Sequence, residues 1–222
     1  MRILIVGNEE RVRELIPRLP ENCQCDVALA PPEDLEGYDL IFDLNFDDNP
    51  ENMSDYKHYT GTVIGGAVKM PMAEALALEK HVNCTLIGMN TLPTLIGREL
   101  AEWSLNGTSD EKEAARVASL LNWDYELVAD RVGMATPRII MMIINEAAYT
   151  IQEGTAQAAD IDEAMRLGTA YPFGPLEWAD RIGIEDVYET LEAIYLDTHD
   201  ERYRICPLLK TMYLESKSFY PQ

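Results

Sequence analysis

The chain has 222 residues, of which 47% are hydrophobic, and its formal net charge at pH 7 is −21. This length and apolar content predict a folded protein with one large or two small domains and exclude a disordered chain. A surface this acidic repels phosphate backbones and anionic headgroups, which argues against nucleic acid and membranes as partners.

The first half of the chain has the pattern of an open α/β sheet. Short apolar runs bounded by Gly, Pro or Asp predict buried strands, and apolar residues at helical spacing predict helices. The predicted strands are residues 3–6, 26–30, 38–45, 63–66, 86–88 and 125–129, and the predicted helices are residues 11–19, 72–81 and 108–121. Their order is typical of an open α/β sheet.

The helix predicted to begin at residue 108 carries a capping-box pattern. Thr108 supplies a hydroxyl, and Glu111 supplies a carboxylate three positions later. Each side chain can bond a backbone N–H that the first helical turn leaves without a partner. The pattern therefore predicts Thr108 as the N-cap.

Beyond residue 130 the chain is predicted to be entirely helical. Pro137 suits the first turn of a long helix that ends near Gly154, because its missing N–H is not needed there. Asp160 is predicted to cap a second helix, which Gly168 ends. Three further helices are predicted to begin at Gly174, Glu185 and Pro207. We therefore predict an α/β domain over residues 1–130 and a helical domain over residues 131–222.

Cysteine and histidine usage argues against a metal site. These residues are Cys23, Cys25, Cys84, Cys206, His58, His81 and His199. No Cys-x-x-Cys pair or other metal-ligand spacing is present. A disulfide framework is possible on count alone, but reduced thiols in a cytoplasmic protein are the favoured interpretation. The first seven residues are too short for a signal peptide, and no apolar run reaches the ~18 residues that span a bilayer.

A string in the last third of the chain resembles a known family. It reads Tyr171-Pro172-Phe173-Gly174-Pro175-Leu176-Glu177 and is followed by Asp180 and Ile182-Gly183, which are expected to end the next helix. Together with its surroundings, residues 128–205, it is similar to the C-terminal helical domain of the 3-hydroxyacyl-CoA dehydrogenase family. The resemblance implies acyl-CoA thioesters as ligands, NAD as cofactor in a Rossmann-like N-terminal domain, and a homodimer formed through the helical domain.

The cofactor turn of that family is degenerate in this sequence. The family's Gly-x-Gly-x-x-Gly turn lets backbone N–H groups approach a pyrophosphate. Here the string is Gly7-Asn8-Glu9-Glu10-Arg11-Val12, and Pro31-Pro32 replaces the acid that holds the ribose. Repulsion between a carboxylate and a phosphate ~4 Å apart is about 1 kcal/mol even in bulk water. We therefore expect only vestigial cofactor contacts, at Gly7 and Asn8.

The first domain is also shorter than the resemblance implies. Few residues separate the second strand from the apolar run Tyr38-Asp39-Leu40-Ile41-Phe42. The family usually has a long helical excursion at this point, which contributes to the acyl-CoA cleft. Its loss argues against a complete cleft.

The catalytic pair of the family is altered as well. The family uses a His as general base, oriented by a Glu. In Ile87-Gly88-Met89-Asn90 the position of the base falls on Asn90, while Glu102 matches the orienting carboxylate. An amide cannot accept a proton at neutral pH, and loss of a general base costs ~10²–10⁴ in rate.

Two further polar positions of the family are lost. The family's Ser falls near Ala67, Val68 or Lys69, none of which has a hydroxyl, and Pro137 replaces the Asn before Arg138.

Three hypotheses follow. The first is a non-catalytic relative that keeps its scaffold for self-association and for binding an acyl-CoA or a partner enzyme. The second is an active NAD-dependent dehydrogenase of fatty-acid metabolism, with Glu102 or Lys69 as the base. The third is a structural or interaction module without a small-molecule ligand. Fold-level resemblance alone does not decide among them.

Overall fold

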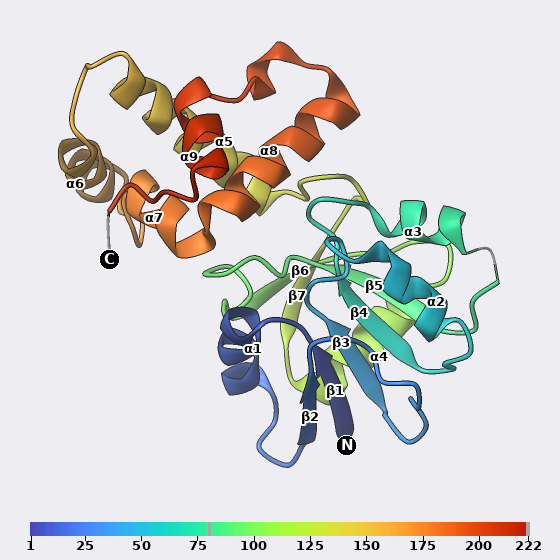
Figure 1. The fold of residues 1–222 in the computed structure, drawn as a ribbon. Coiled ribbons are helices and arrows are strands. Elements are labelled where there is room, and N and C mark those ends of the chain that lie inside the picture. Colours follow the sequence, from blue (N-terminus) through green and yellow to red (C-terminus); the bar gives the residue numbers. More distant parts are fainter. Residues whose placement is uncertain (80, 221–222) are drawn as a thin grey trace. The chain divides into compact units, whose positions relative to one another are not determined.

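The computed structural model describes residues 1–79 and 81–220 (Figure 1). The chain forms two compact units, Met1–Met134 and Ala135–Gln222. The division lies slightly later in the chain than residue 130, where the sequence analysis places it.

The first unit is built on one sheet. Its strands are β1 (Arg2–Val6), β2 (Gln24–Ala28), β3 (Leu40–Asp43), β4 (Thr62–Gly66), β5 (Thr85–Met89), β6 (Leu100–Ser104) and β7 (Asp124–Val128). Within the described residues they form seven strands in the order β2-β1-β3-β4-β5-β6-β7. Every neighbouring pair is parallel except β5 and β6, which are antiparallel. The Rossmann-like α/β class predicted from the sequence is thus confirmed.

The chain leaves β1 toward β2 on one side and returns to β3 on the other. The order therefore reverses between β1 and β3, at the position where open α/β sheets bind ligands beyond the carboxyl ends of their strands. The apolar runs in β1 and β3 are buried on both faces, as their sequences predict.

The helical segments of the first unit are α1 (Glu9–Leu15), η1 (Ile16–Arg18), η2 (Pro50–Asn52), α2 (Met53–Tyr56), α3 (Met72–Leu78) and α4 (Glu111–Leu121). The apolar sides of α1 and α4 share one core with β1, β3 and β6, which includes Phe42, Trp103 and Trp123. The ring of Trp123 lies between the other two, with centroids 5.7 Å from Phe42 and 6.3 Å from Trp103.

Several predictions for this unit need correction. Strand β6 was not predicted as a strand, because its sequence was interpreted only as part of a motif. The N-cap of α4 is Asp110, which accepts from the N–H of Glu113 at 2.9 Å. Thr108 instead accepts from the N–H of Leu86 at 2.9 Å, so its hydroxyl ties the preceding turn to β5. The predicted helix over residues 72–81 ends at Leu78, and residue 80 lies outside the described residues.

The second unit is helical, as predicted. Its elements are α5 (Thr136–Gln152), α6 (Ala158–Thr169), α7 (Pro175–Ile182), α8 (Ile184–Thr198), η3 (Glu201–Tyr203) and α9 (Pro207–Leu214). Pro137, Pro175 and Pro207 each lie in a first helical turn, where proline lacks only an N–H that the helix does not use. The buried sides of α5 and α8 form the core, with Ile144 and Leu191 fully buried.

Three predictions for the second unit are wrong in detail. The cap of α6 is Gln157, not Asp160, which lies in the first turn. The helix continues through Gly168 and ends where Ala170 adopts a left-handed φ of 56°. Gly183, with a φ of 100°, does end α7 as predicted, but Asp180 lies inside that helix and has a different role, given below.

None of the described helices combines the length and apolar character that crossing a bilayer requires. The sulfurs of Cys23, Cys25, Cys84 and Cys206 are free thiols.

Candidate functional site

The structure brings Asn90 and Glu102 together. Asn90 directly follows β5, and Glu102 lies on the antiparallel neighbour β6. The backbone N–H of Asn90 donates to the carbonyl of Glu102 at 3.1 Å, and Asn90 Nδ2 donates to Glu102 Oε2 at 3.4 Å. Strand pairing therefore sets the distance between the two side chains.

The orientation of the Asn90 amide is fixed from both ends. Its Oδ1 accepts from the N–H of Leu92 at 3.3 Å, so its NH₂ group faces Glu102, and the residue is 5% exposed. An amide held in this way donates to the carboxylate and offers no basic nitrogen. The pair can therefore bind and orient a polar group but cannot remove a proton through Asn90.

The carboxylate of Glu102 has a basic neighbour. Burial lowers the pKa of Arg98, and the negative charge of Glu102 acts in the opposite direction. The guanidinium and the carboxylate therefore lie within electrostatic reach of each other.

No imidazole of the first unit reaches this site. His58 precedes β4 and His81 precedes β5, so both lie toward the amino ends of parallel strands, whereas Asn90 lies at a carboxyl end. A five-residue strand spans roughly 16 Å.

The turn after β1 is closed by the chain itself. The N–H of Asn8 donates to Asn45 Oδ1 at 3.0 Å, and Asn8 Oδ1 accepts from the N–H of Arg11 at 3.0 Å. A Cβ on Gly7 would lie 2.9 Å from Leu44 Cβ, so this glycine provides space for Leu44. The two residues predicted as vestigial cofactor contacts, Gly7 and Asn8, thus both contact the loop after β3.

This turn does not fit a pyrophosphate. A dinucleotide site needs open backbone N–H groups and a close approach to the first helix. Here the N–H of Asn8 is bonded to a side chain, and Glu9 and Glu10 place two carboxylates in the first turn of α1. The turn is therefore unsuited to an NAD diphosphate for two reasons: the N–H of Asn8 is already bonded, and the two carboxylates repel the phosphates.

The loop after β3 contributes residues that the sequence analysis did not identify. Asp47 Oδ2 accepts from the N–H groups of Val68 and Lys69, at 2.8 and 2.9 Å. These backbone groups belong to the segment where the resemblance placed a serine. Burial raises the pKa of Asp47, and the nearby charge of Arg11 offsets this only in part.

A second polar pair lies beside Gly66, at the end of β4. Asp47 Oδ1 and Thr91 Oγ1 are buried and have no hydrogen-bond partner among the described residues. A Cβ on Gly66 would lie 2.7 Å from each oxygen. Only glycine fits there, because a larger residue would collide with the Asp47 carboxylate and the Thr91 hydroxyl.

Asp43, the last residue of β3, is a buried carboxyl with an altered pKa. Burial raises the pKa to about 6, although Asn52 Nδ2 and Tyr56 OH donate to the carboxylate at 2.9 and 2.8 Å. These bonds tie β3 to the helical segment that follows it.

The helical unit explains the Pro-Phe-Gly-Pro string. Asp162 on α6 is 4% exposed and accepts from the N–H groups of Leu176 and Glu177, each at 2.8 Å. Its carboxylate thus caps the start of α7, where negative charge is favourable. A Cβ on Gly174 would collide with Asp162, so the glycine is needed for this approach.

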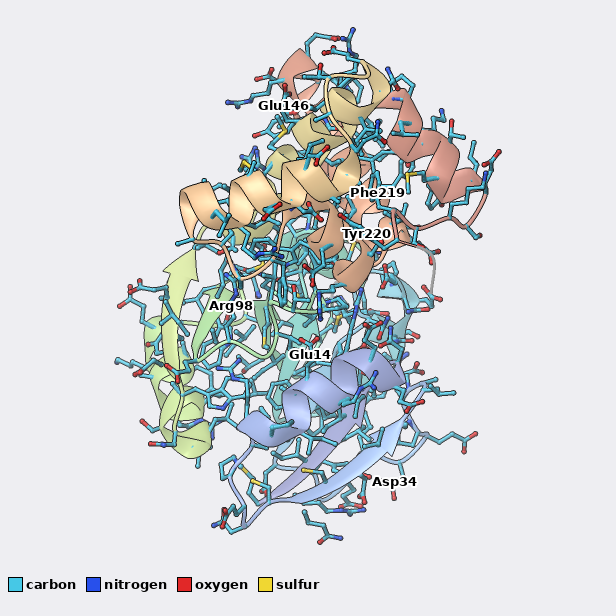
Figure 2. The ribbon with its side chains drawn as sticks, turned by 90° about the vertical axis from the view of Figure 1, so that its left-hand side faces the viewer. Glu14, Asp34, Arg98, Glu146, Phe219 and Tyr220 are labelled. Carbon is cyan, nitrogen blue, oxygen red and sulfur yellow. The ribbon has the colours of Figure 1, made fainter. Side chains whose placement is uncertain are left out.

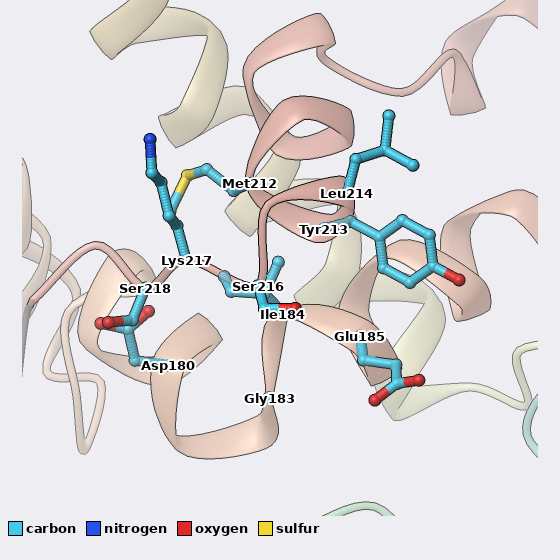
Figure 3. A pocket seen from close by; sticks show the side chains of 10 residues that line it. All are labelled: Asp180, Gly183, Ile184, Glu185, Met212, Tyr213, Leu214, Ser216, Lys217 and Ser218. Carbon is cyan, nitrogen blue, oxygen red and sulfur yellow. The ribbon is translucent and has the colours of Figure 1, made fainter.

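Asp180 and Asp162 also hold the end of the described chain. Asp180 accepts from the N–H groups of Phe219 and Tyr220, at 2.8 and 2.7 Å, and the hydroxyl of Tyr220 donates to Asp162 at 2.8 Å. Phe219 and Tyr220 are labelled in Figure 2. Between this segment and the junction of α7 and α8 lies a cavity of about 560 Å³, lined in part by Ile184, Met212 and Lys217 (Figure 3).

Residues 133–218 match the sequence profile of 3-hydroxyacyl-CoA dehydrogenase, C-terminal domain. The chain is 46% identical over 83 residues to the 3-hydroxyadipyl-CoA dehydrogenase of Escherichia coli K12, which covers 37% of this chain and 18% of that protein. It is 43% identical over 121 residues to the 3-hydroxybutyryl-CoA dehydrogenase of Bradyrhizobium diazoefficiens, a match that covers 54% of this chain and 41% of that protein. The chain thus spans less than half the length of these two relatives.

The fold is also found in solved structures. The crystal structure of M. tuberculosis FadB2 superposes with a TM-score of 0.74 at 17% identity, covering 100% of this chain and 98% of that one. At this identity the likeness concerns the fold alone. The helical unit, with its Pro-Phe-Gly-Pro string and the matched profile, is thus similar to the C-terminal domain of 3-hydroxyacyl-CoA dehydrogenases.

Proposed function

We propose that this chain is a non-catalytic member of its family, which keeps the scaffold but neither binds NAD nor oxidises a hydroxyacyl thioester. The observation that carries the proposal is the Asn90–Glu102 pair, in which an amide donates to the carboxylate at 3.4 Å. A general base must hold a free lone pair of suitable pKa, and Asn90 has none. The closed turn at Asn8 supports the same conclusion for the cofactor.

The alternative, an active dehydrogenase with a different base, has weaker support. Lys69 Nζ lies 2.6 Å from Asp48 Oδ1, and this ion pair favours the charged ammonium, which has no lone pair to accept a proton. Glu102 remains the stronger candidate for that role. The variant Glu102→Gln would abolish any hydroxyacyl-CoA oxidation that uses this carboxylate as the base.

Ligand titration separates the proposals. Calorimetry with NAD, NADH, CoA and an acyl-CoA, each added to the full chain, is expected to give no isotherm with either dinucleotide. A micromolar isotherm with NAD would refute the loss of the cofactor site. An isotherm with acyl-CoA but not with CoA would support retained thioester binding, and the cavity beside Ile184, Met212 and Lys217 is the first place to map it. A response to none would favour the interaction module.

We further propose that the protein is cytoplasmic and self-associates through the helical unit. The similarity of the helical unit to the 3-hydroxyacyl-CoA dehydrogenase C-terminal domain supports the second part. Leu167 on α6, which is 75% exposed, is the residue at which we test it. Sedimentation velocity over a wide concentration range is expected to show a dimer. A monomer at the highest concentration would contradict it.

A further inference from the structure

Three sulfur-bearing side chains lie together at the amino ends of β1 and β2, the two strands that Figure 1 shows side by side. The strands pair in parallel, with Ile3 beside Cys25. The N–H of Gln24 donates to the carbonyl of Met1 at 3.0 Å, so the pairing continues to the start of β1. The register therefore places Met1 beside Cys23.

The three sulfur-bearing side chains share one face of the sheet. Residues two positions apart on a strand point to the same side, so Met1 accompanies Ile3 and Cys23 accompanies Cys25. All three pack against the hydrophobic core that contains Ile3 and Leu15. Each of them is only partly buried, and both thiols are free. The sulfurs are therefore clustered and remain accessible to solvent.

The spacing of the two cysteines suits a shared metal ion better than a disulfide. Alternate residues of a strand are ~6.6 Å apart at Cα, which is near the upper end of the range for disulfides. Two sulfurs on one metal lie up to ~4.6 Å apart, because each metal–sulfur bond is ~2.3 Å long, whereas a disulfide requires about 2 Å. Burial raises the pKa of Cys25, and the neighbouring Cys23 thiol raises it further, so the two sulfurs lie within electrostatic reach of each other.

The ligand set is soft. It consists of two thiols and one thioether, without nitrogen or oxygen, and proteins use such sets for Cu(I). Structural zinc sites almost always have four ligands, so three sulfurs favour Cu(I) over Zn(II). A bound cation also offsets the repulsion between two neighbouring thiolates. Cysteine spacing alone does not predict this site, because Cys23 and Cys25 supply only two ligands and Met1 comes from another strand.

We propose that Met1, Cys23 and Cys25 form a binding site for one Cu(I) ion. Binding forms two copper–thiolate bonds and one copper–thioether bond, the two thiol protons pass to solvent, and the copper stays Cu(I). The site lies at the amino ends of the strands, whereas Gly7 and Asn90 lie at carboxyl ends, and a five-residue strand spans roughly 16 Å. Copper binding is thus independent of the proposed loss of catalysis.

The test measures the Cu(I) affinity of the full chain by anaerobic competition with bicinchoninate, a Cu(I) chelator. One Cu(I) is expected per chain. Cys23→Ser and Cys25→Ser each remove one thiolate at a partly exposed position, and circular dichroism checks that both variants fold. Each is expected to weaken binding at least ~100-fold, because even the outer-shell partners of metal sites contribute about 10–100-fold. Cys84→Ala, which removes a buried thiol on another strand, is the matched control and is expected to bind as the wild type does.

Selenomethionine labelling tests the thioether. X-ray absorption at the copper edge of the labelled chain is expected to show a copper–selenium contact beside two copper–sulfur contacts, because Met1 is in register with Cys23. Absence of the selenium contact, equal affinity in the wild type and Cys25→Ser, or an equal loss in Cys84→Ala would each overturn the proposal. NADH formation from a hydroxyacyl-CoA would refute the proposed function alone and would leave these three results unchanged.

Discussion

Replacing Asp162 with alanine is expected to destabilise the helical unit more than any other single carboxylate change in it. The Asp162 carboxylate is 4% exposed and accepts three hydrogen bonds, from the N–H groups of Leu176 and Glu177 and from the hydroxyl of Tyr220. A buried donor left without a partner costs about 1–3 kcal/mol. Two such N–H groups, with the lost negative charge at the start of α7, give roughly 3–5 kcal/mol.

The assay is urea unfolding of the full chain, followed by hydrogen exchange of peptides from α5 to α9. Exchange of these peptides reports on the helical unit itself, because local opening is read peptide by peptide. Asp160→Ala is the matched control, since Asp160 lies on the same helix but is exposed. It is expected to lose less than about 1 kcal/mol. A loss below about 1 kcal/mol for Asp162→Ala, or equal losses for both variants, would refute the capping role.

Three further predictions test the first unit and the assembly. In the variant Asn90→His, the pKa of the imidazole is expected to lie about one unit above its usual value, because the Glu102 carboxylate is adjacent. NMR titration measures this pKa, and the shift should disappear when Glu102→Gln is added. The pKa of Asp43 is raised to about 6 from 3.8, so the folded protein holds a proton on Asp43 more tightly than the unfolded chain does. This proton contributes roughly 3 kcal/mol of stability below the unfolded pKa, and the contribution is lost as pH rises through 6. Unfolding free energies measured from pH 4 to 8 should therefore fall less steeply in Asp43→Asn, and an unchanged pH profile would contradict the assignment. Leu167→Glu should shift the sedimentation profile toward monomer, with Asp160→Ala unchanged, whereas identical profiles would exclude Leu167 from the interface.

Much of the fold follows from local pattern. Continuous apolar runs predict β1, β3, β4 and β5, because a strand buried on both faces leaves no polar side. Prolines in first turns mark three helices of the second unit. Strand β6 escaped prediction because Glu102 interrupts its apolar residues, so no continuous run marks it and its sequence was interpreted only as part of a motif.

The site depends on partners that sequence spacing does not reveal. Asn90 and Glu102 were paired by resemblance, and their contact arises from the antiparallel pairing of β5 and β6. Arg11 was noted only as part of a lost glycine pattern. It can be buried because its guanidinium donates to the carbonyl of Leu44 and lies beside the carboxylate of Asp48, both in the loop after β3.

The N-cap of α6 was misassigned to Asp160 because sequence spacing does not reveal tertiary partners. Asp160 and Asp162 are both acidic residues at the start of one helix, and only the fold shows that Asp162 caps a different helix.

The central claim is that the scaffold persists without the proton acceptor or the diphosphate site. The most direct test mixes the full chain at high concentration with a 3-hydroxyacyl-CoA and NAD and follows the absorbance of NADH. We expect a trace that matches the buffer blank. Steady formation of NADH that scales with protein concentration and disappears in Glu102→Gln would contradict it.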